Sequence, residues 1–305
     1  MKASKDAYGE VLADFALFMK LEKGLSPHTV AGYLTDCSKL SAFLRGRDLP
    51  ALEDATLDDL TAFLATEEVQ KTGKRSQARL LSAIRSLYAF LEADGRLAGR
   101  ENPSEKLESP RIPTYLPAVL TVEEVSAILD SVDLSSHEGH RNRAMLEMLY
   151  SCGLRVSELV SLHLSDIFRQ DGFVRVTGKG GKQRLVPIGA PALKWLDHWL
   201  QQRALWPVAR SCDDIIFLNR RGGKITREMV FHIVRQQAEA AGIHKTISPH
   251  TFRHSFASHM VENGADLRVV QEMLGHESIL TTEIYTHIDT ARWHQTILRF
   301  HPGND

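Results

Sequence analysis

Residues 101–117, ENPSEKLESPRIPTYLP, contain four prolines and no periodic apolar face. Proline cannot continue a helix and disfavours helical backbone in the residue before it, so this stretch cannot extend the helical patterns on its two sides. We therefore predict a linker at 101–117 between one domain at 1–100 and a second at 118–305. A chain of 305 residues is long enough for two hydrophobic cores.

The composition is that of an ordinary globular protein, with 43% hydrophobic and 25% charged residues. No apolar run has the length of a membrane span, and the N-terminus lacks the apolar core of a signal peptide, so we expect a cytoplasmic protein. Three distant cysteines, Cys37, Cys152 and Cys212, indicate reduced thiols and neither a disulfide framework nor a cysteine-rich metal site.

The first domain has the pattern of several amphipathic helices. One covers about 8–22, the next starts at Ser26 and Pro27, a third starts near Leu57, and a fourth runs from Gly73 to about residue 92. The second domain opens with a capping box of Thr121 and Glu124 before a helix.

Helices then follow at about 122–131, 139–150, 156–162 and 225–241, with strands at 173–177, 184–188 and 215–218. The first two strands flank a GKGG turn and form a hairpin. The second domain should therefore be mainly helical with a small antiparallel sheet, an α+β arrangement.

The stretch from residue 248 onward concentrates polar groups at predicted helix ends. Ser248 is a good N-cap and Pro249 a good first helical residue, which puts His250 and Arg253 on one side of the first turn. Free N–H groups and the positive dipole end there favour an anion, so we predict a pocket for one phosphate group. Another face of this helix should enter the core through Phe252, Phe256 and Met260.

A second helix is predicted over 267–274, with Gly275 in a left-handed cap that presents His276 just beyond it. A short third helix should carry residues 281–285, ending at Tyr285. Each of these polar residues alone would be better explained as a cap, a surface charge or packing, but four at these offsets point to a site. No HExxH pattern or acidic partner supports a zinc site.

The segments HTFRHSFASHM and LGHESILTT, with Tyr285 nine residues after His276, resemble the tyrosine recombinases of the Xer type. GLRVSEL, at 153–159, is similar to the first arginine motif of that family, and VTGKGGKQRLVPI, at 176–188, to its lysine hairpin. The resemblance covers essentially the whole chain. It implies an N-terminal SAM-like helical core-binding domain and a C-terminal catalytic domain with six catalytic residues: Arg155, Lys179, His250, Arg253, His276 and Tyr285.

The implied chemistry is cleavage and rejoining of DNA strands. Arg155 and Arg253 would each donate paired N–H groups to the non-bridging oxygens of the phosphate, and His276 would add a hydrogen bond, because the anion otherwise repels a nucleophile. Tyr285 would attack, helped by His250 as base since a phenol has a pKa of about 10. Lys179 would protonate the 5′ oxygen, leaving a 3′-phosphotyrosyl bond and a free 5′-hydroxyl. The route needs no ATP, metal or other cofactor.

The fourth helix of the first domain supplies local positive charge. The net charge of −1 is not typical of a nucleic-acid-binding protein, so basic groups must gather on one surface. From 69 to 91 no acidic residue occurs, and we predict contact with the DNA backbone, the alternative being a solvated basic face. The predicted contact residues are Lys71, Lys74, Arg75, Arg79 and Arg85.

The resemblance also implies partners. These are double-stranded DNA with a dif-like site, a second Xer-type recombinase in a tetramer on DNA, and a septal DNA translocase, with chromosome-dimer resolution during segregation as the role. The tail after Tyr285, with apolar Ile297, Leu298 and Phe300, either folds back on its own domain or docks on a neighbouring protomer.

Four alternatives remain open. A mobile-element integrase is disfavoured by the compact layout, and a type IB topoisomerase by the apolar tail. A non-catalytic DNA-binding homologue is disfavoured by the complete set of six residues, and a metal-dependent nuclease by the lack of clustered carboxylates near the basic residues.

Overall fold

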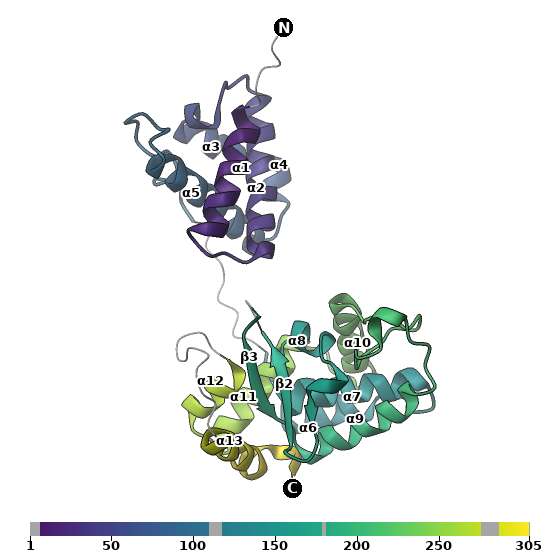
Figure 1. Ribbon diagram of the computed structural model, residues 1–305. Helices are drawn as coiled ribbons and strands as arrows, with labels where there is room; N and C mark the ends of the chain where they lie inside the picture. The colour runs from purple at the N-terminus through teal and green to yellow at the C-terminus, as the bar shows by residue number, and fades with distance from the viewer. Residues whose placement is uncertain (1–6, 110–117, 179–180, 276–286, 305) are drawn as a thin grey trace. The chain divides into compact units, whose positions relative to one another are not determined.

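The computed structural model describes residues 7–109, 118–178, 181–275 and 287–304 (Figure 1). The chain separates into two compact units, Met1–Tyr115 and Leu116–Asp305, and each unit has its own hydrophobic core. Within the described ranges, every helix is too short or too polar to cross a bilayer.

The first unit is a bundle of helices. They are α1 (Ala7–Leu21), α2 (Pro27–Arg45), α3 (Leu57–Leu64), α4 (Glu67–Gln70) and α5 (Lys74–Ala93), with a 3-10 turn at Leu52–Asp54. The four longer helices confirm the predicted pattern, while the single turn α4 and the 3-10 turn are additional. Ser26 caps α2 by accepting a hydrogen bond from the Thr29 amide, 3.2 Å away.

The helix α5 packs against α1 and α2 through the apolar face that the sequence predicts. Its phenolic residue, Tyr88, is fully buried and donates a hydrogen bond to the carbonyl of Leu52 at 2.9 Å. Leu107, within the proline-rich stretch, is buried in the same core. The guanidinium of Arg85 donates to the Leu107 carbonyl at 2.5 Å, which ties this stretch to α5.

The second unit is mainly helical, as predicted, and contains a three-stranded sheet (Figure 1). Its helices are α6 (Val122–Asp130), α7 (His137–Ser151), α8 (Val156–Val160), α9 (Ala190–Arg203), α10 (Arg227–Ala240), α11 (Pro249–Glu262), α12 (Leu267–Leu274) and α13 (His287–Phe300). The capping box of Thr121 and Glu124 before α6 is confirmed. The helix α9 is not among the predicted elements.

The sheet consists of β1 (Ile167–Phe168), β2 (Phe173–Thr177) and β3 (Gln183–Pro187), antiparallel and in that order. The predicted hairpin is confirmed, with its second strand starting one residue earlier. The prediction of a strand at 215–218 is wrong. Ile215 and Leu218 form only isolated bridges, to His163 and Lys224, within the described chain.

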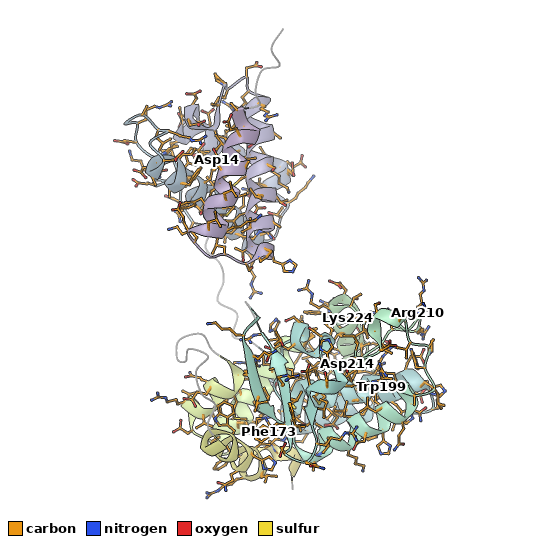
Figure 2. The ribbon with its side chains drawn as sticks, viewed as in Figure 1. Asp14, Phe173, Trp199, Arg210, Asp214 and Lys224 are labelled. Atoms are coloured by element: carbon orange, nitrogen blue, oxygen red, sulfur yellow. The ribbon has the colours of Figure 1, made fainter. Side chains whose placement is uncertain are left out.

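The four residues at 215–218 are buried, so they form an apolar run without belonging to a sheet. A short buried run of this kind cannot be assigned by periodicity alone. Two of their backbone carbonyls instead accept hydrogen bonds from buried side chains. The indole N–H of Trp199, labelled in Figure 2, donates to the Ile216 carbonyl at 2.9 Å, and the guanidinium of Arg203 donates to the Ile215 carbonyl at 2.9 Å.

The C-terminal helix α13 packs on its own unit. Trp293 and Ile297 belong to the second core, and His301, just beyond the helix, is buried against Tyr150 with ring centroids 4.9 Å apart. In this single chain the tail therefore folds back on its own domain, which is the first of the two predicted arrangements.

The packing of α9 leads to a test of stability. Trp199→Phe removes both ring volume and the hydrogen bond to the Ile216 carbonyl, and should lower the free energy of unfolding by about 2–4 kcal/mol. Trp195→Phe, at a partly buried position on the same helix, is the matched control and should cost less than about 1 kcal/mol. All four tryptophans lie between 195 and 293, so denaturation followed by tryptophan fluorescence reports on the second unit. Equal losses would contradict the assigned role of Trp199.

Candidate active site

Arg155 is brought into position by a glycine turn. Gly153 has φ of 56°, in the left-handed region, and a Cβ there would lie 2.7 Å from the Phe256 ring and 2.8 Å from Leu274. Only glycine fits such a close approach. Arg155 then occupies the N-cap position of α8, with about a third of its side chain exposed.

Arg253 lies in the first turn of α11. Ser248 is the N-cap and Pro249 the first helical residue, as predicted. The Arg253 guanidinium is buried, and it donates to the carbonyls of Gly153 and Leu274, both at 2.6 Å. Burial, and then the nearby charge of Arg155, lower the pKa of Arg253 to about 9. The group is therefore still cationic at neutral pH.

Three arginines converge on the C-terminal end of α12. Nε of Arg184 donates to the Met273 carbonyl at 3.0 Å, and Nη2 of Arg253 donates to the Leu274 carbonyl at 2.6 Å. Nη2 of Arg155 donates to the carbonyl of Gly275, the left-handed cap residue, at 3.0 Å. The last carbonyls of a helix lack intrahelical partners and carry partial negative charge, so cations are favoured there. This helix end thus brings Arg155 and Arg253 to one place.

A buried carboxylate completes the cluster. Glu158 of α8 accepts from Arg155 Nη1 at 2.8 Å and, with both oxygens, from Arg184 at 2.7 and 3.0 Å. It also accepts from the Arg155 amide at 2.8 Å. Burial alone would raise the pKa of this carboxyl, but the two arginines and the amide outweigh burial and hold the pKa below its usual range.

Neither Glu158 nor Arg184 is among the predicted site residues. Both lie inside the quoted motifs, GLRVSEL and VTGKGGKQRLVPI. A charged residue that is buried in a strand or helix needs a partner, but the sequence does not identify which distant residue supplies it. The available signal was the period-two alternation of the predicted strand at 184–188, which puts Arg184 on the same face as Val186 and Ile188.

His250 is exposed on the first turn of α11, while Phe252, Phe256 and Met260 are buried as predicted. The predicted phosphate pocket between His250 and Arg253 stays a prediction. Within the described part of the chain, no group of three or more His, Cys, Asp or Glu residues is arranged to hold a metal ion.

Lys179, His276 and Tyr285, with the predicted helix at 281–285, lie outside the described residues. The residues that directly precede the first two are described. A Cβ at Gly178 would lie 3.7 Å from Oε1 of Glu158 and 3.8 Å from Nη1 of Arg184, and the carbonyl of Gly275 bonds to Arg155. Gly178 and Gly275, which directly precede Lys179 and His276 in the sequence, therefore both lie beside the ion pair of Glu158 and Arg184.

The predicted DNA-contact residues differ in their surroundings. Arg79 makes a bidentate ion pair with the buried carboxylate of Asp36, at 2.9 and 3.0 Å, which joins α5 to α2. Lys71 pairs with Glu67 at 2.5 Å, and Arg85 holds the stretch at 107–109. Lys74 and Arg75 are exposed. Contact of any of these residues with DNA stays a prediction.

Comparison with known sequences identifies both units. Residues 118–292 match the phage integrase family, and residues 12–95 match the phage integrase N-terminal SAM-like domain. The chain is 44% identical to the tyrosine recombinase XerD of Chlorobaculum tepidum, over 99% of each chain. It is 39% identical to XerD of Listeria innocua, over 96% of this chain and 99% of that protein.

Solved structures share the fold. The recombinase XerH bound to its difH substrate, in a pre-cleavage complex, aligns with a TM-score of 0.67 at 23% identity, covering 96% of this chain and 97% of that one. A lambda integrase dimer bound to a core site aligns with a TM-score of 0.67 at 19% identity, over 88% and 95% of the two chains. The SAM-like first unit and the α+β second unit expected from the sequence are thus confirmed.

The ion pairs of Glu158 predict how the second unit responds to acid. Because the folded-state pKa is depressed, the carboxylate contributes stability that is complete above about pH 4.5 and is lost as the pH falls further. The free energy of unfolding of Glu158→Gln should therefore fall furthest below that of wild type near pH 7 and approach it near pH 3. Urea unfolding followed by tryptophan fluorescence measures this difference.

Glu147→Gln is the control, because its stability relative to wild type should change with pH in the opposite direction. Burial raises the pKa of Glu147, so its contribution to stability weakens as the pH rises, and the glutamine variant should gain relative to wild type from pH 4 to pH 7. A constant difference between Glu158→Gln and wild type across this range would contradict the assigned ion pairs.

Proposed function

Since the chain belongs to the phage integrase family and is a Xer-type tyrosine recombinase, an enzyme that cleaves and rejoins DNA at specific sites, we propose that Tyr285 is its nucleophile. Attack on the scissile phosphate forms a 3′-phosphotyrosyl bond and releases a 5′-hydroxyl. Reversal of the same step on a new strand rejoins the DNA without an external energy source.

The observation that carries this proposal is the pair of guanidiniums at the end of α12. Arg155 and Arg253 donate to adjacent carbonyls, those of Gly275 and Leu274. Each has five N–H groups, and the hydrogen bonds named above use two of them on each side chain. The remaining N–H groups can bind the non-bridging oxygens as negative charge grows in the pentacoordinate state.

The other roles follow from the family resemblance. His250 acts as general base toward the Tyr285 hydroxyl, and its exposure at the start of α11 leaves it accessible to DNA. His276 adds a hydrogen bond to the phosphate, and in the sequence it directly follows Gly275, whose carbonyl accepts from Arg155. Lys179 protonates the leaving 5′ oxygen. No metal takes part in this scheme.

For the biological role, we propose resolution of chromosome dimers at a dif-like site during segregation. The support is similarity to XerD proteins along the whole chain. A second Xer-type recombinase completes a tetramer on DNA, and a septal DNA translocase controls it. The unit at 1–100 grips the DNA core, and residues 101–117 link it to the catalytic unit at 118–305.

Nucleophile assignment is tested with a nicked suicide duplex carrying a dif-like site. Wild-type protein should form a covalent adduct on denaturing gels, also in EDTA, which a metal-dependent nuclease would not. Tyr285→Phe should form none while binding DNA with affinity within about twofold, because only the attacking oxygen is lost. Tyr33→Phe, in α2, is the control and should form adducts normally.

Adduct formation by Tyr285→Phe would remove this residue from the nucleophile role. Recombination of a phage or transposon attachment site, with no reaction at a dif-like site, would instead favour the mobile-element integrase.

Contact of α5 with the DNA backbone is tested by comparing two arginines. Arg75→Ala should weaken binding to all duplexes alike and reduce the slope of log affinity against log salt by about 1, because one phosphate contact is lost. Arg79→Ala should in addition lower stability by about 1–2 kcal/mol, because it leaves the buried Asp36 carboxylate unpaired. Fluorescence anisotropy at several salt concentrations measures the slope. An unchanged slope for Arg75→Ala would contradict the contact.

A further inference from the structure

Arg184 is a third arginine in the cluster, and the proposed chemistry does not use it. Its side chain is only 7% exposed, whereas about a third of the Arg155 side chain is exposed. All three of its guanidinium nitrogens donate to protein oxygens: two to Glu158, at 2.7 and 3.0 Å, and Nε to the Met273 carbonyl at 3.0 Å.

The Arg184–Glu158 pair lies where three parts of the site meet. Glu158 belongs to α8 and holds Arg155 through Oε1. A Cβ at Gly275 would be 3.2 Å from Cδ and Nε of Arg184, so the end of α12 rests on the guanidinium. A Cβ at Gly178 would be 3.8 Å from Nη1 of Arg184, so the hairpin tip adjoins it as well.

Charge in this cluster is shared between a single carboxylate and three guanidiniums. Oε1 of Glu158 accepts from both Arg155 and Arg184. If Arg184 were absent, the whole negative charge of Glu158 would face Arg155. The carboxylate would then compete with a DNA phosphate for the Arg155 guanidinium, since both are anionic acceptors of the same fork of donors.

We propose that Arg184 is a positioning residue. It engages Glu158 and the end of α12, so that Arg155 is held in place by the carboxylate but remains available to the scissile phosphate. This inference rests on the proposed function of Arg155. The positioning role requires arginine at 184. Its planar guanidinium can bridge two carboxylate oxygens and a backbone carbonyl at once, whereas the ammonium group of lysine is a point charge.

The test is R184K on suicide duplexes, with R175K as the matched control. Arg175 lies on the neighbouring strand β2, where it pairs with Asp166 at 2.8 Å, away from Glu158. R184K should bind DNA with affinity within about twofold of wild type, yet cleave at saturating DNA roughly 10- to 100-fold more slowly, because charge stabilisation in the transition state is weakened. R175K should match the wild type in both.

A second duplex distinguishes positioning from a general loss of structure. It carries a neutral methylphosphonate at the scissile position, so less negative charge has to be stabilised by Arg155. On this duplex the deficit of R184K relative to wild type should shrink to within about threefold. Circular dichroism checks folding. If R184K does not fold, R184Q replaces it, because Glu158 then keeps Arg155 as its arginine partner and the same pattern is expected.

Three results would overturn the proposal: wild-type cleavage by R184K on the charged duplex, an equal deficit on both duplexes, or a loss of DNA affinity that accounts for the rate. Absence of any covalent adduct with wild-type protein would be a different failure. It would contradict the proposed function, and the inference about Arg184 would fall with it.

Discussion

The site depends on the electrostatics of one helix end. The last carbonyls of α12 carry partial negative charge, and Arg184, Arg253 and Arg155 each donate to one of them. Without these carbonyls and Glu158, three guanidiniums would repel one another in a buried place. With them, buried Arg184 and Arg253 are held beside the partly exposed Arg155, and the attraction of the cluster to an incoming phosphate is less screened than at an open surface. The depressed pKa of Arg253, about 9, reflects that crowding and burial.

The same helix end also organises the chain around the site. Gly275 ends α12 in a left-handed cap and leads directly to His276, while Gly153 makes the tight turn before Arg155. The carbonyl of Gly153 accepts from Arg253, so the turn and the arginine of α11 fix each other. In the first unit, the pair of Arg79 and Asp36 has a comparable role, since it joins two helices through a partly buried ion pair. Not every basic residue of α5 is therefore equally free to meet DNA.

Local signals predicted the parts of the structure that depend on local chemistry. Ser248 with Pro249, the cap at Gly275 and the hairpin around GKGG each have a short-range cause, and the structure has them at or within one residue of the predicted positions. The sequence did not predict β1, which is two residues long, or the irregular path of 215–218, because both depend on distant partners. The helix α9 was predictable, since its buried residues recur at helical spacing. Glu158 and Arg184 could be seen in the motifs, but their mutual contact arises only in three dimensions.

The most direct measurement identifies the amino acid that becomes bonded to DNA. Covalent complexes trapped on a nicked suicide duplex would be digested with trypsin, and the peptide that retains nucleotides would be sequenced by mass spectrometry. The account predicts the peptide spanning 269–292, modified at Tyr285 through a 3′-phosphate. Modification of any other residue, or cleaved DNA that ends in a 5′-phosphate without attached protein, would contradict it.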